Sequence, residues 1–86
     1  MYTKLTTMTW SSNEAQTSPV IASARDTYIN NAVTAGTTDG TYAVISPTVT
    51  TRLWLDQVSA DDWATFISTQ ATDIGATCDV TITDNV

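Results

Sequence analysis

Histidine is absent from this sequence, cysteine occurs once and cationic residues occur three times, and each shortage excludes a class of function. Histidine is the side chain whose pKa lies nearest neutral pH, which suits it to general-base catalysis and metal binding. Without it nothing activates the thiol of Cys78, which also has no partner for an internal disulfide. We therefore expect Cys78 to be a small buried apolar residue. We predict no catalytic residue, no metal site and no cofactor, and we expect that the protein is not an enzyme.

The three cationic residues, Lys4, Arg25 and Arg52, are outnumbered by nine acidic ones, and the formal net charge is −6. Affinity for a nucleic-acid backbone or for anionic lipid comes from lysine and arginine, so we expect neither nucleic acid nor a membrane as a partner. No apolar segment has the length needed to span a bilayer. No basic segment with a following apolar run begins at Met1, so no secretory signal peptide is expected, which favours an intracellular protein.

The length of 86 residues, 42% of them hydrophobic, predicts one domain over residues 1–86. Alternating or β-branched runs predict strands over residues 2–10, 41–46, 48–56 and 77–83. Helical spacing of apolar residues predicts a helix over residues 19–35, which begins at Pro19 and ends before Gly36, and a second helix that ends at Gly75. The polar segment 11–16 is expected to be a loop.

This order of elements, β-α-β-β-α-β, is the split βαβ pattern of an α+β, ferredoxin-like fold. We expect two helices on one face of a four-stranded antiparallel sheet, with the first and third strands at its centre and the other face open. A domain of this size buries roughly 60–65% of the surface of its unfolded chain, so an interface between copies would add usefully to its stability.

The beginning of the second helix carries the strongest local signal in the chain. Ser59 is expected to cap it, and Asp62, three residues later, to return the hydrogen bond in a capping box. Val58 is expected to pack on Trp63 as a hydrophobic staple across this end of the helix. The helix is therefore predicted to start immediately after Ser59.

The alternation of the strands predicts which side chains lie on each face of the sheet. If the aliphatic side chains pack under the helices, the side chains at the alternate positions of each strand lie on the open face. The aliphatic set is Leu5, Leu53, Leu55, Val80 and Ile82, and the predicted interface set on the open face is Tyr2, Lys4, Met8, Trp10, Arg52 and Trp54. Tryptophan and arginine are enriched at the energetic centres of interfaces, so we expect a homodimer or a higher homo-oligomer that associates through this face.

Two other interpretations of these aromatic residues stay open. Trp10 could fold over the edge of the sheet, leaving only isolated surface aromatics, which are normal. The aromatic residues could instead serve a small-molecule pocket, in a hollow between helices and sheet lined by Tyr28, Tyr42 and Trp63. General acid–base chemistry there would fall to a buried carboxylate or tyrosine.

Two acidic clusters have simpler interpretations than metal binding. Asp61 and Asp62 fall in the first turn of a helix, where the dipole stabilises carboxylates, and together with Asp56 they lack the regular spacing of a calcium loop. Asp79 and Asp84 lie on or just after an outer strand, where charge discourages pairing with other chains.

The run from Trp54 to Trp63, Trp-x-Asp-x-x-Ser-Ala-x-x-Trp, resembles the strand-to-helix passage of dimeric α+β barrel proteins, among them the antibiotic-biosynthesis monooxygenase and stress-responsive barrel groups. The resemblance implies a homodimer whose sheets face each other. In size, acidity and threonine content the chain is also similar to small uncharacterised proteins of tailed bacteriophages, which implies a location in the host cytoplasm or in a virion.

These patterns predict a non-enzymatic, self-associating interaction or structural protein, encoded by a phage. The alternative is a small-molecule-binding or cofactor-free monooxygenase-like dimeric α+β barrel protein. An RNA-recognition module also places aromatics on its first and third strands, but its glycine-containing aromatic signature is missing here and the net charge has the wrong sign.

Overall fold

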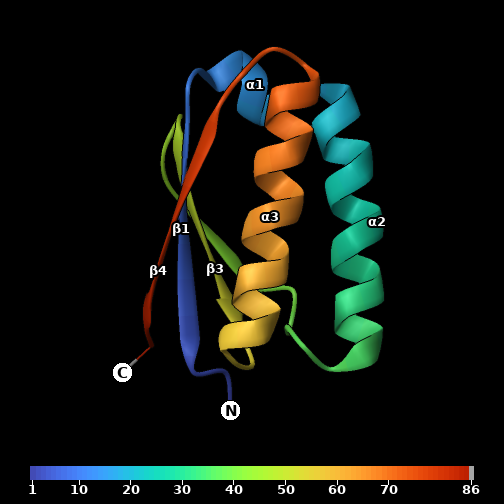
Figure 1. Ribbon diagram of the computed structural model, residues 1–86, viewed down its shortest axis with the longest axis vertical. Coiled ribbons are helices and arrows are strands. Elements are labelled where there is room, and N and C mark those ends of the chain that lie inside the picture. The colour runs from blue at the N-terminus through green and yellow to red at the C-terminus, as the bar shows by residue number, and fades with distance from the viewer. Residues whose placement is uncertain (86) are drawn as a thin grey trace.

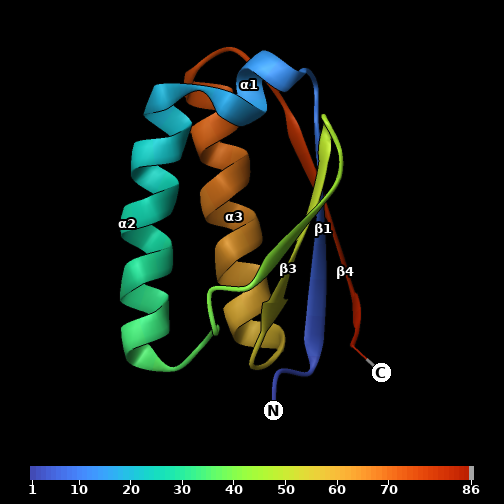
Figure 2. The ribbon, with the colours of Figure 1, turned by 180° about the vertical axis from the view of Figure 1, so that it is seen from behind.

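The computed structural model describes residues 1–85, which form an α+β structure with three helices and one four-stranded antiparallel sheet. Helices and sheet make two layers, with two long helices side by side against one face of the sheet (Figure 1). The elements in chain order are β1 (Lys4–Trp10), α1 (Asn13–Thr17), α2 (Pro19–Ala35), β2 (Tyr42–Ser46), β3 (Val49–Trp54), α3 (Gln57–Asp73) and β4 (Cys78–Asp84). Seen from behind, the far face of the sheet carries no helix, and both termini lie at the same end of the molecule (Figure 2).

The strands lie in the order β2-β3-β1-β4, and every neighbouring pair is antiparallel. The first and third strands are therefore central, as the sequence predicts. On the central strand β1, Leu5 lies opposite Leu53 on one side and Thr83 on the other. The register between β2 and β3 shifts between Val44 and Ser46, which makes a bulge on the edge strand β2.

The first long helix agrees with its predicted bounds. α2 begins at Pro19, whose missing N–H is not needed in the first turn, and ends at Gly36, which adopts the left-handed conformation with φ 81°. The N–H of Gly36 donates to helix carbonyls that would otherwise lack a partner.

The predicted start of the other long helix is wrong by one turn. Asp56, not Ser59, caps α3, and its carboxylate accepts a hydrogen bond of 2.9 Å from the backbone N–H of Ser59. Val58 is 67% exposed, so it does not form the expected staple with Trp63. The earlier start places Ser59 inside the helix, where it joins Ala60 and Trp63 among the buried residues of α3 and donates its backbone N–H to the cap.

The segment predicted as the loop 11–16 contains the short helix α1. Ser12 caps it by accepting a hydrogen bond from the N–H of Ala15, at 3.1 Å, and Ala15 is buried. α1 consists of four polar residues and one alanine. Apolar periodicity cannot predict such a helix, because a single apolar position has no period.

The predicted assignment of the two sheet faces is also wrong for the central strands. Met8, Trp10, Arg52 and Trp54 are buried beneath the helices, whereas Leu5 and Leu53 lie half-buried on the face without helices. The expectation does hold on β4, where Val80 and Ile82 pack against the core. On β1 and β3 the tryptophans and the methionine, not the leucines, lie on the inner face.

Aromatic packing explains why the tryptophan face is the inner one. Trp54 is 1% exposed and its ring stacks on that of Trp63, with centroids 5.4 Å apart, while Tyr28 meets it edge-on at 6.3 Å. A buried indole removes roughly 150–250 Å² from water, more than a leucine can. Turning these rings outward would lose more hydrophobic free energy than burying Leu5 and Leu53 would gain.

Candidate ligand-binding site

A cavity of about 130 Å³ lies at the side of the core, between the sheet and the helices. We call it the Arg52 pocket, and Met8, Trp10, Gln16, Arg25, Asp26, Tyr42, Val44, Thr50, Arg52 and Trp63 line it. The elements that meet here are far apart in the sequence. Strands β1, β2 and β3 supply one wall, and the helices α1, α2 and α3 supply the other.

Arg52 is the central charged group of this pocket. The alternation of β3 directs its side chain under the helices, where it is only 8% exposed. The guanidinium carbon lies 4.8 Å from the ring centroid of Tyr42 and 5.6 Å from that of Trp63. Within residues 1–85 the one ion pair joins Lys4 to Asp84, so Arg52 lies against aromatic rings and has no carboxylate paired with it.

The pKa of Arg52 is lowered to about 10, chiefly because burial penalises its charge. The neighbouring positive charge of Arg25 lowers it further, while Tyr42 and Asp26 act in the opposite direction. The cation–π contacts stabilise the charge by about 0.5–2 kcal/mol, whereas removing an ion from water costs several kcal/mol. The aromatic contacts therefore do not compensate fully for the burial of this cation.

Arg25 brings a second guanidinium to the same pocket from α2. Its Nη1 donates a hydrogen bond of 3.2 Å to the backbone carbonyl of Gln16, in α1. The short helix that the sequence did not reveal thus helps to orient a charged side chain of the pocket. With Asp26 as the one acidic lining residue, the ionised groups of the pocket add to a charge of +1, in a chain whose net charge is −6.

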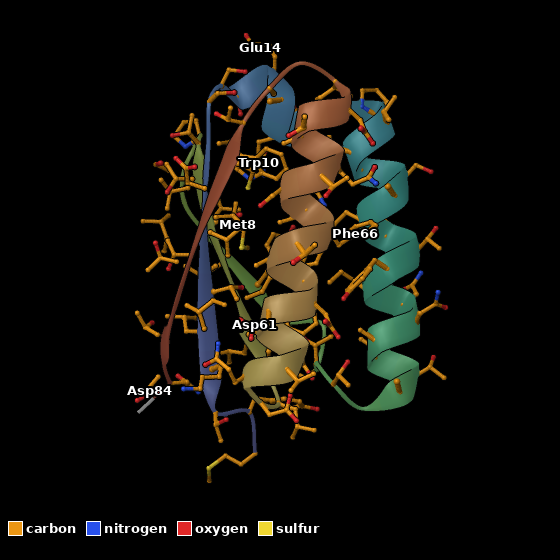
Figure 3. All side chains as sticks on the ribbon, viewed as in Figure 1. Met8, Trp10, Glu14, Asp61, Phe66 and Asp84 are labelled. Atoms are coloured by element: carbon orange, nitrogen blue, oxygen red, sulfur yellow. The ribbon has the colours of Figure 1, made fainter. Side chains whose placement is uncertain are left out.

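Trp10 contributes an unused hydrogen-bond donor. The indole N–H of Trp54 donates to the hydroxyl of Thr6 at 3.0 Å, and that of Trp63 to the sulfur of Met8 at 3.3 Å. The N–H of Trp10, a side chain only 4% exposed, has no hydrogen-bond partner in the described part of the chain. Figure 3 shows Met8 and Trp10 extending from β1 into the layer between sheet and helices. An indole nitrogen only donates, so this group requires an acceptor.

The six residues of the predicted interface do not share an exposed face. Met8, Trp10 and Arg52 line the Arg52 pocket, and Trp54 belongs to the aromatic core. Lys4 pairs with Asp84 on the adjacent strand, at the end of β1. Tyr2 precedes β1, and its carbonyl accepts a hydrogen bond from Asn85.

The residues suggested for a hollow between helices and sheet are divided between two places. Tyr42 and Trp63 line the Arg52 pocket. Tyr28 of α2 stacks its ring on that of Phe66 of α3, with centroids 4.4 Å apart, and Figure 3 shows Phe66 between the two long helices. Burial raises the pKa of Tyr28, with the nearby carboxylate of Asp62 adding to the effect.

The sequence did not reveal that Gln16, Arg25 and Asp26 belong to this site. Arg25 and Arg52 are two of only three cationic residues in the chain. This scarcity was the one feature of the sequence that could have pointed to them as members of a site. Nothing in the spacing of residues 25 and 52 shows that a helix and a strand bring them together.

The face of the sheet without helices is the second surface of interest. We call it the uncovered sheet face, and by strand register it carries Leu5, Thr7, Thr9, Ala43, Val49, Thr51, Leu53, Asp79, Thr81 and Thr83. Threonine and half-buried aliphatic side chains dominate it, and it has no tryptophan or arginine. It is therefore chemically unlike the face that the sequence predicted.

Comparison with protein-family models, with curated proteins and with solved structures finds no match to this chain. Within residues 1–85 no helix has both the length and the apolar character needed to cross a membrane. The same residues contain no group of three or more histidine, cysteine or acidic side chains arranged to hold a metal ion. Asp56 is the cap of α3, and Asp61 accepts a hydrogen bond of 2.9 Å from the amide of Gln57.

Proposed function

We propose that this protein binds a small molecule that carries an anionic group, and that the group lies against Arg52 in the Arg52 pocket. The observation that carries the proposal is Arg52, a cationic residue only 8% exposed that has no carboxylate partner in residues 1–85. Buried charges in proteins are usually paired, because an isolated one costs several kcal/mol. A ligand anion would supply the missing partner.

Two further features support the same function. Arg25 adds a second positive charge to the pocket, and Trp10, another lining residue, carries a buried N–H without an acceptor. All three groups favour an acceptor with negative charge, and a cation would be repelled by both guanidinium groups. At physiological ionic strength the Debye length is about 8 Å, so the distant acidic residues of the chain oppose such a ligand only weakly.

Differential scanning calorimetry with a panel of small anions tests this function. Acetate, benzoate, isovalerate, phosphate and phenyl phosphate are added to the wild type and to Arg52→Met at millimolar concentration. We expect at least one anion to raise the Tm of the wild type and to leave that of Arg52→Met unchanged, because only a ligand of the folded state stabilises it. Lys4→Met is the matched control, since it removes a cation outside the pocket, and it should respond like the wild type. A panel without any Arg52-dependent shift would reject the function.

A second candidate function is self-association through the uncovered sheet face. Leu5 and Leu53 are cross-strand neighbours on the two central strands of this face, both half-buried without any helix above them. Aliphatic and threonine side chains on a sheet face without helices suit contact with a second sheet. The arrangement accords with the ferredoxin-like fold, which we propose on the strand order and element order, and with the homodimer that the dimeric α+β barrel resemblance implies. The phage origin stays a prediction.

Size-exclusion chromatography with light scattering tests this second function. We expect a dimer or larger species at tens of micromolar, and we expect Leu53→Lys to convert it to a monomer. Thr65→Lys, at an exposed position of α3, is the matched control and should leave the oligomer intact. A wild-type protein that is monomeric throughout this range would contradict self-association.

A further inference from the structure

We infer that the ligand of the Arg52 pocket is a small monocarboxylate with an apolar body. This inference rests on the proposed binding function and adds the chemical class of the ligand. Charge, size and the nature of the walls each restrict what the pocket accepts.

The charge of the pocket favours one negative charge on the ligand. Arg25 and Arg52 provide two positive charges and Asp26 one negative charge, which leaves +1 to be neutralised. A carboxylate carries one negative charge, whereas a phosphate monoester carries about −1.5 to −2 at neutral pH. A phosphate would therefore leave excess negative charge close to Asp26.

The donors of the pocket suit the geometry of a carboxylate. The planar guanidinium of Arg52 presents parallel N–H groups that match the two oxygens of one carboxylate. Each oxygen has a further lone pair, so an acceptor remains for the N–H of Trp10, which has no partner among residues 1–85. A neutral amide offers only one acceptor oxygen and places its NH₂ donors toward the guanidinium.

The walls and the volume of the pocket restrict the part of the ligand that lies beyond its carboxylate. Met8, Val44 and Trp63 give the pocket apolar surfaces beside its charged groups. Its volume of about 130 Å³ is close to that of an engineered apolar cavity of about 150 Å³ in another protein, which binds benzene. The pocket therefore suits a branched aliphatic chain or a single ring, and excludes a nucleotide or a sugar phosphate from its interior.

Titrations followed by the ¹⁵N–¹H resonances of the protein test this inference. The probes are benzoate, isovalerate, benzamide and phenyl phosphate, with the wild type and the variants Arg52→Met, Arg52→Lys, Trp10→Phe and Asp26→Asn. We expect benzoate or isovalerate to shift the indole N–H of Trp10, and benzamide to bind at least tenfold more weakly. Arg52→Lys keeps the charge and loses the planar fork, so it should weaken carboxylate binding severalfold. Asp26→Asn should improve the binding of phenyl phosphate more than that of benzoate.

The outcomes separate the ligand class from the function. If phenyl phosphate or benzamide binds the wild type more tightly than both carboxylates, and Arg52→Met abolishes that binding, the monocarboxylate assignment is overturned and the binding function stands. If no probe gives shifts that depend on Arg52, both the monocarboxylate assignment and the proposed binding function are rejected. Should Arg52→Met fail to fold, Arg52→Lys and Trp10→Phe still decide, because Trp10→Phe removes the N–H donor while it keeps one apolar aromatic ring at this position.

Discussion

The indole N–H of Trp54 donates a hydrogen bond of 3.0 Å to the hydroxyl of Thr6, across the two central strands of the sheet. Both side chains are fully buried, and the hydroxyl of Thr6 in turn donates to the backbone carbonyl of Arg52 at 3.3 Å. Thr6 thus connects the indole ring of Trp54 to the backbone of Arg52, the central charged residue of the pocket. The bond lets an indole be buried without an unpaired donor.

Thr6→Val should destabilise the fold, because it keeps the shape of the side chain and leaves the Trp54 N–H without an acceptor. The expected loss in the free energy of unfolding is about 1–3 kcal/mol. Urea denaturation followed by far-UV circular dichroism measures it. Thr7→Val, on the uncovered sheet face, is the matched control and should change stability by less than about 0.5 kcal/mol. Equal effects of the two substitutions would contradict the burial assigned to Thr6.

Trp54→Ala and Leu53→Ala together test which face of β3 is the inner one. Trp54 is buried against Trp63 and Tyr28, so its truncation should cost about 3–5 kcal/mol. Leu53 is half-buried on the uncovered sheet face, and its truncation should cost about 1 kcal/mol or less. Denaturation midpoints give the order, and Trp54→Phe serves if Trp54→Ala does not fold. A larger loss for Leu53→Ala than for either Trp54 variant would mean that the faces are reversed.

Asp56→Ala should lower the Tm at neutral pH by roughly a few degrees, as the loss of a helix cap does. Ser59→Ala should have the smaller effect, because alanine retains the backbone N–H that donates to the cap and loses only the weaker contribution of the Ser59 side chain.

The same cap has a pH dependence of defined sign. Hydrogen bonds from the backbone and then the side chain of Ser59 hold the pKa of Asp56 below its usual value. A carboxylate with a lowered pKa stabilises the fold above its unfolded pKa, and this contribution is lost as the pH falls through the folded pKa. The Tm difference between wild type and Asp56→Ala should therefore shrink between pH 6 and pH 2. A difference that grows on acidification would contradict Asp56 as the cap.

Cys78 should be unreactive in the native protein. Burial, with a smaller effect of Asp79, raises the pKa of its thiol to about 12. At pH 8 the thiolate fraction is then on the order of one in ten thousand, and the thiolate is the species that reacts with disulfide reagents. Labelling with 5,5′-dithiobis(2-nitrobenzoate) should be slow in buffer and fast in 6 M guanidinium chloride. Rapid stoichiometric labelling of the native protein would show that the thiol is accessible.

The order of elements was predictable because caps and periodicity are local. Pro19 and Gly36 mark the ends of α2 within the sequence itself, and alternation identifies the strands. Alternation does not say which of two faces is inside, however. On β1 and β3 both parities carry large apolar side chains, Leu5 and Leu53 on one and Met8 and Trp54 on the other. Only the aromatic partners on the helices decide between them.

The start of α3 and the Arg52 pocket illustrate two further limits. Asp56 and Ser59 are both good caps, one turn apart, and the structure buries Ser59 within the first turn of the helix instead of using it as the cap. The pocket depends on how α2 lies over the sheet, which brings Arg25 to Arg52 across 27 positions of sequence. Local sequence patterns carry no information on which distant residues lie close together in the fold.

The stacked rings of Trp54 and Trp63 also make the chain its own optical probe. They join β3 to α3, with centroids 5.4 Å apart and planes inclined at 28°. Near-UV circular dichroism reports fixed aromatic packing and is lost when helices persist without it. Trp10 and Trp63 border the Arg52 pocket. The intrinsic fluorescence of the tryptophans should therefore change both when the helices separate from the sheet and when a ligand binds, without any added label.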